Sequence, residues 1–444
     1  MDCSLIHPNP VADKKLSNNL KAHTGCRLAI LALAAGLLIG TASCSDRERA
    51  NPFDPNSPNY GLEGLGFNAL AGNEEVLLYW DRLDYYDLAG FDVLRVCLSG
   101  QDTVVLNDSI LPPDVISFID PTPENDVSYA YSLRMLLTTS DERPVTMADI
   151  ATPGLMFGWM IARNGIEVWK MTPDFRDKLF SLDSDFLQVE DIQVRPPGKT
   201  EVWVLDGAYK QMVRFHVDGT WMDDEPLFRN TTAFLFNQDD KSLWVASDDV
   251  GGIIYHFNKN GALAESFLTG VTATSLAINF AGTGVWIGTS ENRVLKVHEG
   301  KVLQVDYDGF SQPRLAASGI YSASAWVLDT ALKQLFYISG ENVEWEISGF
   351  VKPSDITVNS QGTICWMADP GADILYEIDL NGQITAMVKG LGQPDKLTFA
   401  PEDNTIYVSG RTGKVSKVAA GGTVIWQREL PFTPGRIALQ QSIR

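Results

Sequence analysis

The segment KPSDITVNSQGTICWMADPGADILYEIDLNG, residues 352–382, holds three short apolar runs separated by turn residues. The runs are Asp355–Val358, the CWMAD stretch around Trp366, and residues 374–378, and an Asn-Gly pair closes the segment. Short runs rich in Ile, Val, Tyr and Trp between Gly, Asn and Asp are typical of antiparallel strands joined by tight turns. The segment therefore predicts a small meander of strands.

The same pattern recurs along the second half of the chain. An aromatic residue followed by an apolar residue and a small or polar turn is repeated at intervals of 44, 41, 42, 40, 40 and 41 residues. A period of 40 to 44 residues with several strands per repeat is typical of a β-propeller, and the Gly turns exclude helical solenoids of similar period. We expect seven blades in residues 154–444, each marked by one aromatic: Trp159, Trp203, Trp244, Trp286, Trp326, Trp366 and Tyr407.

The two ends of this region complement each other. The repeat of Trp159 has no inner strand before it, whereas residues 434–439 are in register with residues 394–399, the inner strand of the last repeat. The C-terminal strand is therefore expected to pair with the first repeat and to close the propeller, which hides two strand edges from solvent.

Two marks of the repeat resemble the NHL and gluconolactonase-like propellers, in which Pro precedes the inner strand and Asp follows the second. Here the prolines are Pro313, Pro353, Pro394 and Pro434, and the aspartates are Asp206, Asp329 and Asp369. The resemblance implies the fold. The lactonases of that class bind a metal through acidic and amide side chains on the central tunnel and usually have six blades. No such set aligns here, so their activity is not carried over.

Residues 61–150 form a separate unit of alternating apolar runs at the spacing of a β-sandwich. This unit resembles a fibronectin type III domain, because Trp80, the GFDVLRV run at residues 90–96, and the pair Tyr129 and Tyr131 fall where that family has its core Trp and its tyrosine-bearing strands. We expect these aromatics to be core residues and the unit to be a spacer or docking module. The predicted fold class is thus all-β, a fibronectin type III-like sandwich followed by a seven-bladed β-propeller closed by the C-terminal strand.

The N-terminus carries an export signal. Residues 28–40 are thirteen uncharged residues after Arg27, too short for a bilayer span, and Thr41-Ala42-Ser43-Cys44 follows. This run resembles the lipobox of bacterial lipoproteins, although Thr41 stands where that family usually has Leu. The resemblance implies a signal peptide at 1–43, a lipidated Cys44, and an outer-membrane or cell-surface location. An ordinary secretory signal is the alternative. The Pro-rich residues 44–60 are predicted to be an extended tether.

Charge and cysteine content limit the partners. With 35 Lys plus Arg against 56 Asp plus Glu, the net charge is −21, which argues against nucleic acid as a partner. Cleavage before Cys44 removes four basic and two acidic residues, so 31 against 54 leaves −23. Cys97 and Cys365 then remain, in different predicted domains. We expect each to be a small buried hydrophobe without a disulfide.

A basic residue recurs seven positions after the aromatic in four repeats, and the connections between repeats add three more. In an up-and-down meander these positions share one face, which we predict to be the partner-binding face, while acidic turns lie on the opposite face. The alternative is that these bases form surface ion pairs with turn acids such as Asp206 and Asp329. The predicted face comprises Lys210, Arg293, Lys333, Lys414, Arg229, Arg314 and Lys352.

No catalytic motif appears in the sequence, and neither a cofactor nor a metal is predicted. Asp206, Asp329 and Asp369 are expected to accept backbone N–H bonds in their own turns rather than bind a cation. His216, His256 and His298 recur at repeat spacing and are expected to lie apart. The chain is interpreted as an envelope lipoprotein whose propeller binds or scaffolds a protein or glycan. Alternatives are a metal-dependent lactonase, lyase or hydrolase, and a structural component of an envelope complex.

We predict that Cys44 carries the membrane anchor, because the short apolar core ends in small residues at this cysteine and a polar tether follows. Mass spectrometry of the native N-terminus should find an acylated Cys44. An unmodified Cys44, or an end created by cleavage elsewhere, would contradict the anchor.

Overall fold

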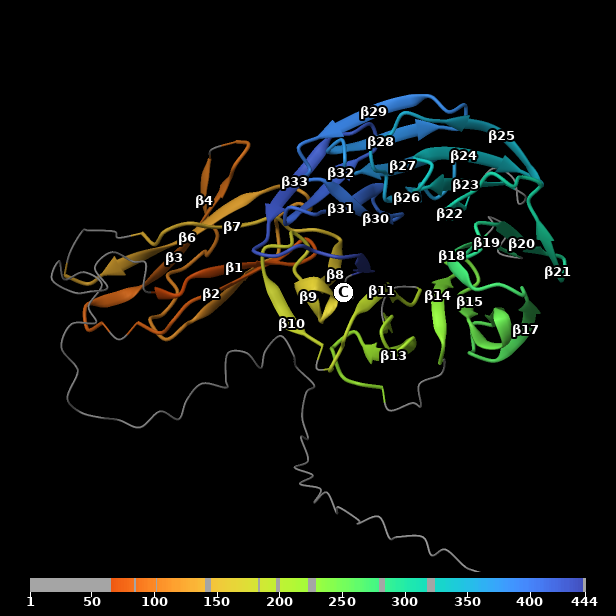
Figure 1. Cartoon of the computed structure of the whole chain (residues 1–444). Coiled ribbons are helices and arrows are strands. Elements are labelled where there is room, and N and C mark those ends of the chain that lie inside the picture. Colours follow the sequence, from red (N-terminus) through yellow and green to blue (C-terminus); the bar gives the residue numbers. More distant parts are fainter. Residues whose placement is uncertain are drawn as a thin grey trace, which may run out of the picture. The chain divides into compact units, whose positions relative to one another are not determined.

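The computed structural model describes residues 65–83, 85–100, 102–139, 145–182, 184–196, 200–222, 229–278, 284–317 and 324–441. The expected signal peptide, Cys44 and the tether lie outside these residues. The described chain is all-β, with antiparallel strands and short 3-10 turns at Arg163–Gly165 and Asp249–Gly251 (Figure 1). None of its helices has the length and hydrophobicity that a membrane crossing requires.

The first part of the chain folds into two sheets around one core. Their facing sides alternate buried and partly exposed residues, as in β6 with its pattern of inward Tyr129, Tyr131 and Leu133. Both sheets contribute to a single hydrophobic cluster that includes Leu78 and Phe91. The sheets are β1 (Asn68–Ala71), β2 (Val76–Tyr79) and β5 (Ser117–Asp120) in the order β1-β2-β5, and β3 (Leu88–Cys97), β4 (Thr103–Val105), β6 (Tyr129–Leu137) and β7 (Asp149–Ala151) in the order β4-β3-β6-β7.

The aromatics expected in this core are buried. Trp80, directly after β2, is 3% exposed and packs edge-on against Phe91 with ring centroids 5.7 Å apart. Tyr131 is fully buried, and its hydroxyl donates to Asp120 at 3.0 Å, which satisfies the polar end of the ring. The prediction for the cysteines is right for Cys365, which is buried, and wrong for Cys97. Cys97 lies at the end of β3, where its thiol is only partly covered and contacts the Ser99 hydroxyl.

Seven further sheets follow along the chain from residue 156. Each is an antiparallel meander in chain order, apart from the first, whose innermost strand comes from the C-terminus. The first sheet contains β8 (Met156–Ala162), β9 (Glu167–Met171), β10 (Lys178–Ser181) and β34 (Ile437–Gln441), and the second contains β11 (Val189–Val194), β12 (Glu201–Asp206) and β13 (Gln211–His216). The third contains β14 (Thr231–Phe236), β15 (Leu243–Ser247), β16 (Ile253–Phe257) and β17 (Leu263–Leu268), the fourth contains β18 (Ala273–Ile278), β19 (Val285–Thr289), β20 (Val294–His298) and β21 (Lys301–Gln304), and the fifth contains β22 (Pro313–Ala317), β23 (Ser324–Asp329), β24 (Gln334–Ser339) and β25 (Asn342–Ile347). The sixth contains β26 (Asp355–Val358), β27 (Ile364–Asp369), β28 (Ile374–Asp379) and β29 (Ile384–Lys389), and the seventh contains β30 (Pro394–Ala400), β31 (Thr405–Gly410), β32 (Lys414–Ala419) and β33 (Val424–Glu429).

Each repeat aromatic lies in the second strand of its sheet and is buried. The predicted pairing of the C-terminal strand with the first repeat is confirmed, since Ala438 of β34 is opposite Trp159 of β8. The indole N–H of Trp159 also donates to the Gln440 side chain at 2.9 Å. Two residues that are 281 positions apart in the chain thus share a buried hydrogen bond.

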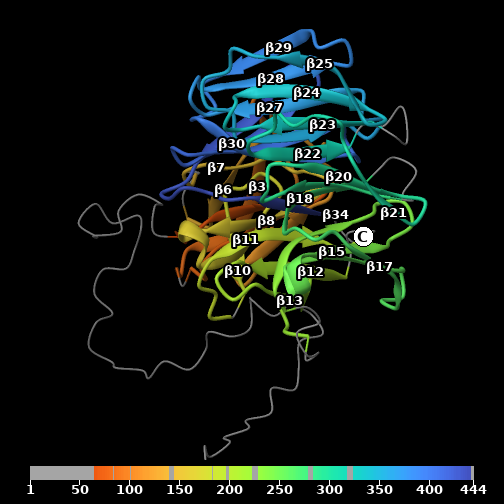
Figure 2. The same ribbon diagram turned by 45° about the vertical axis from the view of Figure 1, so that its right-hand side comes forward.

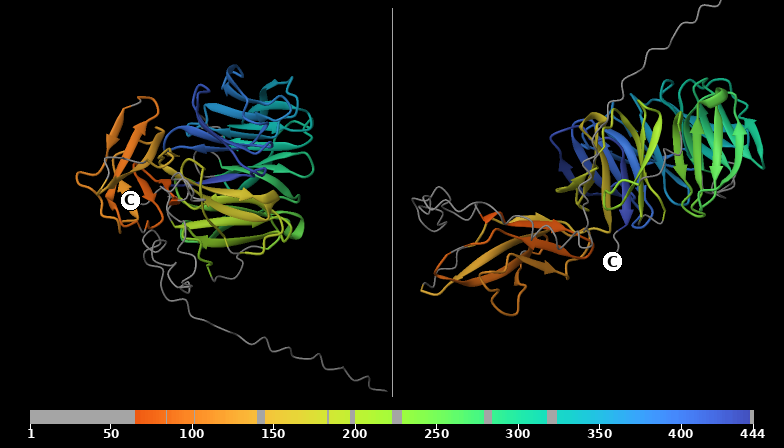
Figure 3. Two further views of the ribbon diagram at one scale, coloured as in Figure 1. Left: turned by 90° about the vertical axis from the view of Figure 1, so that its left-hand side faces the viewer. Right: turned by 90° about the horizontal axis from the view of Figure 1, so that it is seen from below.

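The first strand of each sheet contacts the first strand of the next. Contacts join β11 to β14, β14 to β18, β18 to β22, β22 to β26, β26 to β30 and β30 to β34, and β34 in turn contacts β11. Figures 2 and 3 show the sheets following one another in chain order, from yellow through green to blue. The apolar clusters lie between successive sheets. One joins Trp326 of β23 to Met367 of β27, and the next joins Trp366 of β27 to Val408 of β31.

We predict that deleting residues 434–444 lowers the free energy of unfolding by more than about 3 kcal/mol, because the deletion uncovers the inner edge of β8 and removes buried Ile437 and Ala438. Denaturant unfolding of residues 61–444 measures the change. Deleting only residues 442–444, which follow β34, is the matched control and should have little effect. Equal stability of the two truncated proteins would contradict the role of β34.

Candidate functional site

Five of the seven residues of the predicted basic face lie in the loops where the meander puts them, and Arg314 and Lys414 lie within strands. Lys210, Arg293 and Lys333 lie between the second and third strands of their sheets, and Lys414 is the first residue of β32. Arg229 and Lys352 lie in the connections before β14 and β26. Arg314 was expected in such a connection but is the second residue of β22, so that expectation was wrong by one element.

Three of these cations are paired with acids. Lys210 pairs with Asp248, Arg293 pairs with Glu291, and the Lys414 ammonium lies 3.8 Å from the Glu429 carboxylate. The surface ion-pair interpretation is therefore right for these three, although their partners are not Asp206 or Asp329. Partly exposed pairs of this kind contribute about 0–1 kcal/mol and leave little charge for a partner.

The other four cations differ. Arg229, Arg314, Lys333 and Lys352 are exposed, and within the described residues no acid lies within ion-pair distance of any of them. Three of them belong to two neighbouring sheets. Arg314 is in β22, Lys333 follows β23 of the same sheet, and Lys352 leads into β26 of the next. We call Arg314, Lys333 and Lys352 the basic sector.

Buried aspartates fix the backbone of this sector. Asp329 is fully buried at the end of β23 and accepts the N–H groups of Ser311 and Gln312 at 2.5 and 3.1 Å. It also accepts those of Ala331 and Leu332 at 3.1 and 2.9 Å. One carboxylate thus joins the connection that leads to Arg314 to the turn that carries Lys333.

Asp369 repeats this arrangement in the next sheet. It is fully buried and accepts the N–H groups of Val351 at 2.7 Å, Lys352 at 2.9 Å and Ala372 at 3.1 Å. Asp206 likewise accepts from Leu187, Ala208 and Tyr209. The predicted use of the three aspartates in their own turns is confirmed. The bond from each aspartate to the incoming connection was not predicted.

In other sheets a different residue stands at the end of the second strand, where Asp206, Asp329 and Asp369 stand in theirs. Ser247 and Thr289 occupy the equivalent position of β15 and β19, and the Thr289 hydroxyl accepts the Arg293 N–H at 3.0 Å. In β31 the position is Gly410. A Cβ there would lie 2.5 Å from the carbonyl oxygens of Leu391 and Gly392, so the incoming connection occupies the space of a side chain. The aspartate joint therefore marks only some sheets.

Acidic residues converge near the starts of several first strands, where a guanidinium neutralises them. Arg436 lies 3.3 Å from Asp191 of β11 and 3.2 Å from Asp355 of β26. Asp355 also accepts the Leu397 N–H at 3.0 Å. Burial raises the pKa of Asp191, and the neighbouring charge of Arg436 opposes that rise. These groups satisfy one another as an ion-pair network.

No metal centre is found in the part of the chain that the structure describes, where no group of three His, Cys, Asp or Glu side chains is placed to hold an ion. The three histidines occupy nearly equivalent places in the third strands of their sheets. His216 and His298 are the last residues of β13 and β20, and His216 is opposite Glu201, two residues before the repeat aromatic. His256 is one residue before the end of β16, opposite Trp244, and stacks on it with ring centroids 4.1 Å apart.

A second repeating position escaped the sequence analysis. In every one of the seven sheets, the residue of the third strand opposite the repeat aromatic is charged, polar or Tyr, and four of these residues place a cation over the ring at 5.1–5.7 Å. The sequence signal that could have revealed this position is a charged, polar or Tyr residue ten to twelve positions after each aromatic. The residues are Lys170, Arg214, His256, Lys296, Tyr337, Glu377 and Lys417.

Several of these side chains join their sheet to the next. Lys170 donates to the Val217 carbonyl at 2.7 Å, Lys296 donates to the Gly340 carbonyl at 3.0 Å, and Glu377 accepts the Gly421 N–H at 2.8 Å. Burial among aromatic rings lowers the pKa of Lys170 to about 8. Lys417 differs, since its buried ammonium pairs with Asp403 at 2.8 Å and with Asp126 at 2.6 Å. This position therefore serves packing between sheets.

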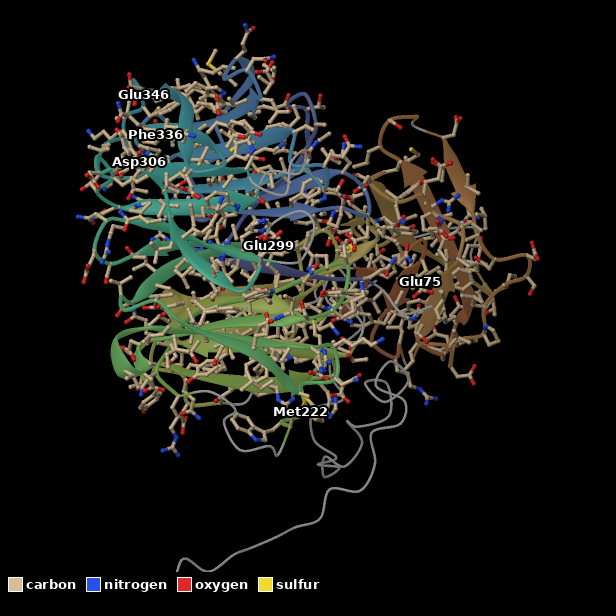
Figure 4. The ribbon with its side chains drawn as sticks, turned by 90° about the vertical axis from the view of Figure 1, so that its right-hand side faces the viewer. Glu75, Met222, Glu299, Asp306, Phe336 and Glu346 are labelled. Carbon is tan, nitrogen blue, oxygen red and sulfur yellow. The ribbon has the colours of Figure 1, made fainter. Side chains whose placement is uncertain are left out.

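Acidic residues lie in other turns of the sheets than the basic residues, between the third and fourth strands in the case of Glu299. Glu299, in the turn between β20 and β21, is 84% exposed and lies 3.8 Å from the His298 ring (Figure 4). Thus the basic sector and the acidic turns belong to different sets of loops.

Comparison with known proteins adds no activity. No family model matches the chain, and no curated protein matches it. A solved structure of a functionally unknown protein from Desulfotomaculum acetoxidans DSM 771 is similar at 10% identity, with a TM-score of 0.48, over 64% of this chain and 99% of that chain.

We predict that Asp329→Ala lowers the free energy of unfolding by about 3 kcal/mol or more, because four N–H groups at a buried joint lose a charged acceptor. Asp379→Ala is the control, since Asp379 accepts the backbone N–H groups of Asn381 and Gln383 and the Asn381 side-chain amide, all in its own exposed turn, and it should cost about 1 kcal/mol. Urea unfolding measures both. A calcium-dependent rise in the melting temperature of the parent protein would instead indicate a cation ligand.

Proposed function

We propose that the chain is an exported lipoprotein, anchored through Cys44 at the outer membrane or cell surface, that binds a partner and does not catalyse a reaction. In this proposal the part from residue 154 onward is the binding module, and its partner is an anionic protein or glycan of the envelope. The basic sector of Arg314, Lys333 and Lys352 is the contact surface.

The seven sheets are, in this proposal, the blades of a closed β-propeller. Support comes from the contacts between successive first strands, which return from β34 to β11, and from the pairing of β34 with β8. Each sheet then has both faces covered by its neighbours, as the apolar clusters between sheets require.

The first part is proposed to be a fibronectin type III-like sandwich that spaces or docks the binding module. The strand orders β1-β2-β5 and β4-β3-β6-β7 and the shared core around Trp80 and Tyr131 support it. The Asp126–Lys417 ion pair adds one link from this part to the seventh sheet.

One observation carries the proposed function: buried aspartates hold the backbone beside the basic-sector cations in a fixed conformation. Asp329 and Asp369 hold the peptide groups beside Arg314, Lys333 and Lys352 with seven hydrogen bonds, so the loops are ordered before any partner binds. A pre-ordered loop loses less conformational entropy on binding. Exposed cations that meet no acid among the described residues then attract an anionic surface at long range.

The enzyme alternative, a metal-dependent lactonase, lyase or hydrolase, has less support. It needs acidic and amide side chains that converge with free oxygens for a metal. Asp191 and Asp355 do converge, but their oxygens are taken by Arg436 and by the Leu397 N–H. A binding role is therefore the better proposal. An obligate structural subunit would differ from it only in having a permanent partner.

The decisive experiment compares two triple variants that change the net charge equally. Changing Arg314, Lys333 and Lys352 to Glu reverses the unpaired cations, whereas changing Lys210, Arg293 and Lys414 to Glu reverses cations that already face acids. We predict that capture from native envelope extracts falls at least tenfold with the first variant and much less with the second. Capture by the parent should weaken steeply as salt is raised.

Circular dichroism and melting temperature of both variants establish that the fold is intact. Equal losses in the two variants would mean that only net charge matters, and would contradict the basic sector. Metal-dependent turnover of a lactone or ester by the parent protein would overturn the binding assignment.

A further inference from the structure

Three large apolar side chains are exposed to solvent, and each is followed in the chain by a lysine. The pairs are Tyr209-Lys210, Leu332-Lys333 and Val351-Lys352, whose apolar members are 59%, 40% and 52% exposed. A scattered exposed apolar residue is normal on a protein surface. These three are not scattered, because each pair lies at one of the three buried aspartates that fix the loops.

The aspartate holds the apolar residue of each pair by its backbone. It accepts that residue's N–H group at 3.3 Å for Asp206 and Tyr209, at 2.9 Å for Asp329 and Leu332, and at 2.7 Å for Asp369 and Val351. Two sheets without the aspartate show the contrast. Thr289 and Gly410 stand in its place there, and the residues before the basic side chain are Asn292 and Gly413.

Two of the pairs, the one after β23 and the one before β26, belong to neighbouring sheets. Phe350 directly precedes the second of these pairs, is 7% exposed, and belongs to the same apolar cluster as Leu328 and Leu335. These two leucines flank the turn that carries the first pair. The cluster therefore brings both pairs to the joint between the fifth and sixth sheets. We call this set the mixed surface: Leu332, Lys333, Val351 and Lys352.

The charges of the mixed surface are available to a partner. Neither Lys333 nor Lys352 meets an acid among the described residues, whereas Lys210 of the remaining pair is ion-paired with Asp248. Free cations attract carboxylates, and apolar side chains at fixed positions favour apolar groups that cover them. Both kinds of contact are thus offered at one joint.

The apolar members are aliphatic, which bears on the class of partner. Sugar rings stack on aromatic side chains, of which the mixed surface has none, whereas protein side chains pack well on leucine and valine. A protein surface can also place carboxylates directly beside apolar side chains. The composition of the mixed surface therefore favours a protein over an acidic glycan.

We propose that the partner of the basic sector is a protein, which docks an acidic segment with apolar side chains on the mixed surface. This inference rests on the proposed function and names the class of its partner. The carboxylates of the segment meet Lys333, Lys352 and the neighbouring Arg314, and its apolar side chains cover Leu332 and Val351. Because the aspartates already fix the loop backbone, little backbone ordering opposes docking.

The test measures how tightly the protein binds a short synthetic peptide of Glu and Leu residues, by fluorescence anisotropy. Leu332→Ser combined with Val351→Ser removes the apolar contacts and keeps every charge, and should weaken binding at least about fivefold. The matched control is Leu187→Ser combined with Tyr209→Ser. These residues are also exposed and bound through their N–H groups to a buried aspartate, Asp206, and the control should stay within about twofold of the parent.

Two further probes separate charge from apolar contact. A peptide with Ser in place of Leu, and an oligomer of galacturonic acid with as many carboxylates, should each bind the parent at least about tenfold more weakly than the Glu and Leu peptide. Failure of the Glu and Leu peptide to bind the parent would overturn the proposal. So would equal binding of either further probe, unchanged affinity in the Leu332 and Val351 variant, or an equal loss in the control.

The basic-sector variant distinguishes this inference from the proposed function. If changing Arg314, Lys333 and Lys352 to Glu abolishes capture while the Leu332 and Val351 variant binds as the parent does, the basic sector stands and only the protein partner fails. If the change to Glu leaves capture intact, the proposed function itself fails.

Discussion

A narrow antiparallel sheet with apolar residues on both faces is stable only when neighbouring sheets cover both faces. Each sheet from residue 156 onward has a buried second strand, such as β23, in which every residue is buried. A sheet in isolation would expose these residues to water at a cost of about 25 cal/mol per Å² of apolar surface. The joints between sheets, the placement of charge and the use of the C-terminal strand all meet this requirement.

The polar groups between the sheets follow from the same requirement. A strand whose faces are both buried can admit a charged side chain only where a partner satisfies it. Lys296 meets this condition through the Trp286 ring and the Gly340 carbonyl, and Glu377 meets it through Thr385 and Gly421. Asp329 does the same at the end of its strand. The buried polar contacts and the fixed orientation of the loops therefore both follow from the need to cover the two faces of each sheet.

Much of the strand pattern could be predicted from the sequence, because the repeat aromatic and the turn residues are local signals. Asp355–Val358 has the expected bounds, and β34 pairs with β8 as expected. The candidate site could be predicted from the sequence only in part. Lys210 and Lys333 occupy the same repeat position, yet among the described residues only Lys210 meets an acid, Asp248, which belongs to the next sheet. A partner that belongs to a neighbouring sheet leaves no signal in local spacing.

The hydrogen bond between Trp159 and Gln440 has a consequence for the order in which the chain becomes structured. Contacts between residues far apart in sequence form slowly, because the loop between them must close first. The first sheet is therefore completed only after the last strand has been made and released, and a ribosome that still holds the C-terminus delays this step. Until then β8 has an unpaired edge, at which a chaperone or a protease can bind the nascent chain.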